Sequence, residues 1–270
     1  MSRPRPDRAG VLRNYHSRSD HHSKVACLGV VLDLMRTCTL LRTHAAEGRV
    51  AFGVNHKMSD FRNRRSKKLD LVIHTPSSTP GARGRSLADL FAREDVLLDP
   101  AEKAALDALP ALREAPVGGV LLALEAKACM TEHQKALPRL YDELNSSHLT
   151  VHGAHDGAIA CGFLMINAAG TFVSPGRNAA GSGAEVVVTR HVQPRATELV
   201  IGKARELPRR SSPAGEGYDG FAIVVVDCPN DGSLVRLLDR PPAPPHGDDY
   251  HYTSMIDRVA GLYSVRFAQI

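Results

Sequence analysis

Residues 117–128, Val-Gly-Gly-Val-Leu-Leu-Ala-Leu-Glu-Ala-Lys-Ala, constrain the fold more than any other stretch of the chain. From Val120 to Leu124 the sequence is apolar without interruption, which is typical of a short strand buried on both faces of a helix-covered sheet. The strand pattern continues into Glu125 and Lys127, which share one face because side chains alternate along a strand. Two charges at the end of a buried strand are costly unless they pair or bind a ligand. This stretch therefore predicts a central strand that ends in an ion pair or a functional site.

The composition is that of a globular protein with a large core. The chain has 270 residues, of which 43% are hydrophobic and 23% are charged. No apolar run approaches the roughly 20 residues that span a bilayer, and the N-terminus lacks the apolar core of a secretory signal. We therefore expect a cytoplasmic protein without a membrane segment. The five cysteines are scattered, which favours reduced thiols over a disulfide framework or a CxxC metal site.

Periodicity and turn signals divide the chain into three parts. Residues 1–18 are rich in Arg, Pro and Ser and predict a flexible basic arm. Residues 19–168 predict a core with the order helix, strand, strand, helical insert, strand, helix, strand. Residues 169–270 predict an α/β extension that packs on the core and serves recognition or dimerisation. The predicted fold class is α/β, with a central mixed β-sheet flanked by helices.

The elements of the core and the extension have approximate predicted bounds. The core helices are expected at 19–46 and 131–152, with the helical insert at 87–112. The core strands are expected at 49–54, 69–74, 117–128 and 158–168. The extension is expected to contain strands at 185–192 and 221–226 and helices at 197–207 and from about residue 249 onward.

Basic residues gather just before the predicted strand 69–74. The formal net charge is +5 and the sequence pI is about 9.0, a modest bias towards a polyanionic partner. The basic side chains nearest the strand are Arg62, Arg64, Arg65, Lys67 and Lys68. They predict contacts with a nucleic-acid backbone, and a solvated loop with a basic bias is the alternative interpretation.

A second carboxylate, Asp70, stands near the start of the strand 69–74. Asp70 and Glu125 would offer hard oxygen ligands from neighbouring strands, and Mg²⁺ commonly uses one or two carboxylates together with water. Lys127 would orient or polarise a water molecule and offset negative charge that develops during hydrolysis of a phosphodiester. The alternative is that Glu125 and Lys127 form a structural ion pair without a catalytic role.

An Asp on one strand followed by Glu-x-Lys on the next, in the order helix–strand–strand–strand–helix–strand, resembles the PD-(D/E)xK nuclease superfamily. Type II restriction endonucleases are its best-known members. The resemblance covers residues 19–168. The proline expected before Asp70 is absent, because the sequence reads Lys68-Leu69-Asp70. The Gln-x-x-x-Tyr element of the RecB-like branch is also absent, since Gln134 and Tyr141 have a different spacing.

The resemblance implies a restriction-endonuclease-like core and a Mg²⁺-dependent endodeoxyribonuclease with Asp70, Glu125 and Lys127 as catalytic residues. Asp70 and Glu125 would be the metal ligands. The partners implied are DNA and a second copy of the chain, because one centre cuts one strand of a duplex.

Other residues give weaker hypotheses. Glu47 is a candidate additional metal ligand from the first helix, and His133 a candidate to face the scissile phosphate. His148, His152 and His155 have a spacing that could place them on one helical face as ligands of a zinc-dependent hydrolase. A further alternative is a non-catalytic DNA-binding protein on the same fold.

Overall fold

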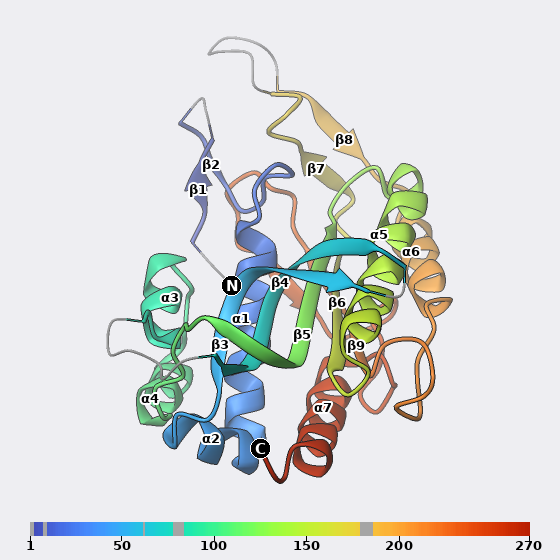
Figure 1. Cartoon of the computed structure of the whole chain (residues 1–270). Helices are drawn as coiled ribbons and strands as arrows, with labels where there is room; N and C mark the ends of the chain where they lie inside the picture. The colour runs from blue at the N-terminus through green and yellow to red at the C-terminus, as the bar shows by residue number, and fades with distance from the viewer. Residues whose placement is uncertain (1–2, 8–9, 62, 78–83, 179–185) are drawn as a thin grey trace.

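A six-stranded mixed β-sheet organises the chain, in the strand order β10-β9-β6-β5-β4-β3 (Figure 1). The computed structural model describes residues 3–7, 10–61, 63–77, 84–178 and 186–270. The strands of this sheet are β3 (Ala51–Asp60), β4 (Arg65–Pro76), β5 (Val117–Cys129), β6 (Ile159–Asn167), β9 (Gly220–Asp227) and β10 (Arg236–Leu238). The predicted class, an α/β fold with a central mixed sheet flanked by helices, is confirmed.

Strand direction follows from the connections. A short turn joins β3 to β4, and β3, β4 and β5 form an antiparallel meander. Helices α5 (His133–Ala154) and α6 (Arg195–Arg205) lie in the connections that lead to β6 and β9, so β5, β6 and β9 are parallel. β10 closes the sheet antiparallel to β9.

Helices cover both faces of the sheet. One apolar core lies between the sheet and the helices α1 (His21–Thr37), α2 (Thr39–Ala46), α3 (Leu87–Arg93) and α7 (Tyr252–Arg266). The other core lies between the opposite face and α5 and α6. α4 (Pro100–Ala108) follows α3 in the insert between β4 and β5. Leu124 and Ala126 belong to the α1 face and Ala123 to the α5 face, so alternation places Glu125 and Lys127 on the α5 face.

Three local differences from the predicted elements have physical reasons. The single helix expected at 19–46 is two helices, because Cys38 is extended (φ −92°, ψ 102°) and its sulfur caps α2 by accepting the N–H of Leu41. The basic segment is the tip of the β3–β4 hairpin, so both strands are longer than expected. β10 was not predicted, because a strand of three residues is too short to give an alternating pattern, and both Arg236 and Leu237 are exposed.

The sheet runs through the boundary expected at residue 168. β9 pairs with β6, and α7 packs against α1, so elements of the predicted extension complete the sheet and one of its helical layers. A second small sheet pairs β7 (Thr171–Val173) with β8 (Val188–Arg190). The roles expected for the extension, recognition or dimerisation, stay predictions.

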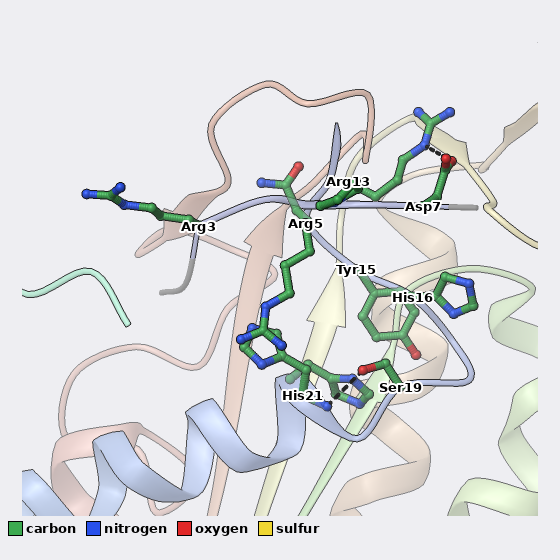
Figure 2. Close-up of a pocket in the computed structure, with 11 residues that line it drawn as sticks. Arg3, Arg5, Asp7, Arg13, Tyr15, His16, Ser19 and His21 are labelled. Atoms are coloured by element: carbon green, nitrogen blue, oxygen red, sulfur yellow. Dashed lines mark hydrogen bonds and ion pairs between the residues drawn. The ribbon is translucent and has the colours of Figure 1, made fainter. Parts of the chain in front are cut away.

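The described N-terminal residues contain a hairpin, whereas the sequence predicted an arm without regular structure. β1 (Arg5–Pro6) pairs with β2 (Leu12–Arg13). Arg13 is 8% exposed, and its guanidinium donates to Asp7 Oδ2 at 3.2 Å (Figure 2). It also donates to the carbonyl of Asn230 at 3.1 Å. The ion pair links the two sides of the hairpin, and the hydrogen bond to Asn230 joins the segment to the loop after β9. Within the described ranges, no helix is long and apolar enough to cross a membrane.

A buried carboxylate joins the C-terminal helix to the sheet. Asp219 is fully buried, accepts the backbone N–H of Ala160 at 2.9 Å, and pairs with Arg210 (2.9 Å) and Arg266 (2.7 Å). Burial alone would raise the pKa of Asp219, but the hydrogen bonds from the two guanidinium groups outweigh it and lower the pKa. The network therefore stabilises the fold only while Asp219 is ionised.

We expect Asp219→Asn to lower the free energy of unfolding by about 3 kcal/mol at neutral pH, because it leaves buried guanidinium charge uncompensated. Asp107→Asn, which removes an exposed pair with Lys103, should cost less than about 1 kcal/mol. The Asp219 contribution is complete above the pKa of an unfolded aspartate and is lost as the pH falls through the lower folded-state pKa. Urea denaturation followed by circular dichroism at several pH values should therefore show the free energies of unfolding of the wild type and of Asp219→Asn converging in acid. An equal difference at all pH values would contradict this.

Candidate active site

β4 and β5 part at the position of Asp70. Their antiparallel pairing reaches Leu71↔Leu124, and beyond it β4 pairs with β3, which turns with it towards α5 (Figure 1). Where the pairing between β4 and β5 stops, the Asp70 side chain takes the place of a backbone acceptor. Its Oδ2 accepts the N–H of Ala126 at 2.8 Å. Asp70 is thereby held against the strand that carries Glu125.

Glu125 is buried beside two ammonium groups. It is 2% exposed, its Oε1 lies 2.7 Å from Lys127 Nζ, and the same oxygen lies 3.5 Å from Lys67 Nζ. Its other oxygen, Oε2, is buried and has no hydrogen-bond partner within the described part of the chain. Burial raises the pKa of Glu125, and the nearby Asp70 raises it further, while Lys127 and Lys67 oppose the shift. The carboxylate is therefore half satisfied, which is costly for a buried group.

Helix α5 packs beside Lys67 and Lys127 and contacts both. Glu143 Oε2 lies 3.5 Å from Lys127 Nζ, and its Oε1 accepts Arg139 Nε at 2.6 Å. The ammonium of Lys67 donates to the backbone carbonyl of Glu143 and, at 3.1 Å, to Ser146 Oγ. The site thus has a third contributing element that the motif does not include.

Asp70 opens into a cavity on the α1 side of the sheet. The cavity has a volume of about 130 Å³ and is lined by residues of α1, β3, β4 and the α3 region, among them Lys24, Cys27, Arg85 and Glu94. Burial raises the pKa of Asp70, against the opposing effects of the Ala126 N–H and Lys127. Both carboxylates of the site are therefore desolvated, and the negative charge of Asp70 raises the pKa of Glu125.

The donor set fits a hard divalent cation. A metal ion would satisfy the orphaned Glu125 Oε2 and relieve the repulsion between Glu125 and Asp70. Among the residues that the structure describes, no group of three or more His, Cys, Asp or Glu side chains is arranged to hold a metal. Two carboxylates suffice for Mg²⁺, which retains several waters.

Two of the additional candidates are not brought to this site. Glu47 follows α2, pairs with Arg49, and stands just before β3, whose first residue Ala51 pairs with His74 at the far end of β4 from Asp70. His133 is 4% exposed, and its Nε2 lies 2.8 Å from the carbonyl oxygen of Asn167, so it is neither a surface residue nor turned towards Glu125.

The three histidines expected on one helical face have separate environments. His148 Nε2 bonds Asn145 Oδ1 at 3.0 Å, and His152 Nε2 bonds the carbonyl of Gly217 at 2.9 Å. His155 follows the end of α5 and is extended (φ −155°), which removes it from the helical face. Burial lowers the pKa of His148 to about 4 and also lowers that of His152, so the neutral form of both imidazoles is favoured.

The basic segment divides between the surface and the site. Arg64, Arg65 and Lys68 are exposed on the hairpin tip, while Lys67 points inward. Arg62 lies outside the described residues. The sequence analysis grouped Lys67 with the residues expected to contact DNA. Its inward direction was not predictable, because it depends on how the hairpin packs on α5. The contribution of Glu143 had no signal in the sequence, because it depends on the same packing.

Asp60 and Gly153 set how the hairpin packs. Asp60 is 1% exposed, and its carboxylate accepts the N–H of Asn63 at 3.1 Å and the Asn63 amide at 2.9 Å. A Cβ at position 153 in α5 would lie 2.1 Å from Asp60 Oδ1. Only glycine therefore lets the tip of β3 approach α5 this closely.

We expect Gly153→Ala to destabilise the protein by about 1–3 kcal/mol, because the added methyl group overpacks the contact with Asp60. Gly202→Ala, in α6, is the matched control, since a Cβ there meets nothing within 4 Å and should stabilise by up to about 1 kcal/mol. Chemical denaturation gives both values, and hydrogen exchange should increase in β3 and β4 of the Gly153 variant. Unchanged exchange in the hairpin would contradict the proposed contact.

The comparisons with known proteins leave the geometry as the basis for assigning a function. No family model matches the chain, and no curated protein and no solved structure is significantly similar to it. The functional argument therefore depends on the parting of β4 from β5, on the half-satisfied Glu125 carboxylate, and on the lysines that face it.

Proposed function

We propose that this chain is a Mg²⁺-dependent DNA endonuclease of the PD-(D/E)xK superfamily, with Asp70, Glu125 and Lys127 as its catalytic centre. The observation that carries the proposal is the buried Glu125 carboxylate. One of its oxygens is held by lysine and the other has no hydrogen-bond partner among the residues that the structure describes, beside a second desolvated carboxylate. A purely structural ion pair would not require the orphaned oxygen or Asp70.

The order and direction of the elements support the proposal. The order is helix (α1 and its continuation α2), antiparallel meander (β3, β4 and β5), helix (α5) and parallel strand (β6). This is the order that the resemblance implies for a restriction-endonuclease-like core, with α3 and α4 inserted before β5. Asp70 stands where two strands of the meander part, and Glu125 and Lys127 stand on the neighbouring strand.

Each residue of the centre has a defined part in phosphodiester hydrolysis. Asp70 and Glu125 hold Mg²⁺, which when bound stabilises charge on the phosphoryl oxygens and lowers the pKa of an attacking water. Lys127, with its side chain 27% exposed, orients that water and offsets negative charge that develops on the phosphate. Glu143 on α5 keeps Lys127 close to Glu125.

The hairpin tip supplies the DNA-binding surface in this proposal. Arg64, Arg65 and Lys68 are exposed on the segment that leads directly into Asp70, so phosphate contacts there would place the duplex over the centre. Cutting both strands of a duplex requires two such centres, which a C₂ homodimer would provide.

Incubating duplex DNA of high sequence complexity with purified protein and Mg²⁺ tests the proposal. We expect cleavage that a chelator abolishes, and a loss of about a hundredfold or more in rate for Asp70→Ala and for Lys127→Ala. Lys103→Ala, on exposed α4, should cleave like the wild type. Sequencing the ends identifies the site that is cut. Cleavage that survives both substitutions would reject this centre, and DNA binding without turnover would favour a non-catalytic binding protein.

The proposed contact surface makes a separate prediction about salt. Lys68→Ala should weaken DNA binding, measured without divalent metal, and lower the slope of log affinity against log salt by about 1, because one phosphate contact is lost. Lys203→Ala, on α6, serves as the control for a surface lysine away from the hairpin. An unchanged slope for the Lys68 variant would place the DNA elsewhere on the molecule.

A further inference from the structure

We propose that Lys67 is a positioning residue that fixes Glu125 for metal binding and so leaves Lys127 available for catalysis. This inference rests on the proposed function, and it assigns to Lys67 a part that differs from the phosphate contact expected from its place in the basic segment. Lys67 stands on β4, three residues before Asp70, and the motif does not include it.

The first argument is that the hydrogen-bonding capacity of Lys67 is already used. Its side chain is 17% exposed, and its Nζ donates to the carbonyl of Glu143, to Ser146 Oγ at 3.1 Å, and lies 3.5 Å from Glu125 Oε1. An ammonium group has three donors, and each of these acceptors can take one. A contact with a DNA phosphate would require breaking this set.

The second argument is the asymmetry at Glu125. Both lysines approach Oε1, while Oε2 has no partner within the described residues. Two cations on one oxygen restrict rotation of the carboxylate and hold the other oxygen in a fixed direction. The effect is that of the partners that orient metal-ligating side chains in metalloenzymes.

The third argument is that the two lysines differ in their freedom to move. Lys67 is tied to backbone and hydroxyl oxygens of α5, and the same Glu143 carbonyl also accepts the hydroxyls of Ser146 and Ser147 at 2.9 and 2.8 Å. Lys127 contacts the side-chain carboxylates of Glu125 and Glu143, which can move with it or release it. When Lys127 turns to the attacking water, Lys67 still holds Glu125 in place.

The hairpin connects this role to DNA binding. Lys67 lies on the same strand as Arg65 and Lys68, and the hairpin is seated on α5 by the contact between Asp60 and Gly153. A duplex that binds the exposed tip would therefore contact β4, the strand that also carries Lys67 and Asp70. Two of the residues proposed to contact phosphate and the residue proposed to position Glu125 thus lie on one strand.

Mn²⁺ binding to the full-length protein without DNA, followed by electron paramagnetic resonance, tests the role directly. Lys67→Met should raise the dissociation constant for Mn²⁺ about 10- to 100-fold, the usual effect of removing a group that orients a metal ligand. Lys67→Arg should recover most of the affinity, because it restores the cation. Lys103→Met, on α4, should bind Mn²⁺ like the wild type, and Lys68→Met should weaken DNA binding without changing Mn²⁺ affinity.

The outcomes separate this inference from the proposed function. If Glu125→Gln and Asp70→Asn lose Mn²⁺ binding but Lys67→Met does not, the metal centre stands and the role of Lys67 is rejected. If the wild type and all these variants fail to bind Mn²⁺, both proposals are rejected. Ser146→Ala removes one acceptor of Lys67 without changing charge, and it should weaken Mn²⁺ binding in the same direction but less. Should Lys67→Met not fold, wild-type affinity in the Ser146 variant would overturn the inference.

Discussion

The burial of Glu125 is the constraint on which the site depends. A carboxylate that is 2% exposed must be compensated, and Lys127 and Lys67 provide this from two different strands. Their compensation is incomplete, because both act on one oxygen. A core optimised for stability would contain an apolar residue at this position, so the retained charge has a cost that stability does not explain. A ligand for the second oxygen, as the proposed metal site would supply, would explain it.

The fold creates this position by changing strand direction at the centre of the sheet. β5 is antiparallel to β4 on one side and parallel to β6 on the other. β4 can therefore leave β5 with its hairpin partner β3 while β5 continues beside β6. The departure exposes the backbone of β5 at Ala126, which Asp70 then satisfies. The acidic pair is thus a consequence of where the ladder stops, and α5 closes the opening from the other face.

Local patterns in the sequence were sufficient for the main helices and strands of the core and for the pairing of charges along one strand. The apolar run 120–124 predicted a buried strand, and alternation placed Glu125 and Lys127 on one face, as the structure has them. Features that depend on packing between distant segments were not predictable. The inward direction of Lys67 requires α5, and the helix break at Cys38 depends on a sulfur cap that no propensity encodes. The single helical face expected for His148, His152 and His155 does not form, because α5 ends before His155.

The charges around the site favour the arrival of metal and DNA together under the proposed function. Asp70, Glu125 and Glu143 carry three negative charges, and Lys67, Lys127 and Arg139 carry three positive charges, so the cluster is formally neutral. A divalent cation would add two positive charges to this desolvated and formally neutral centre. A phosphodiester offsets one of these charges and also supplies an oxygen ligand. Under the proposed function, Mg²⁺ and DNA would therefore each strengthen the binding of the other, a coupling that must be reciprocal.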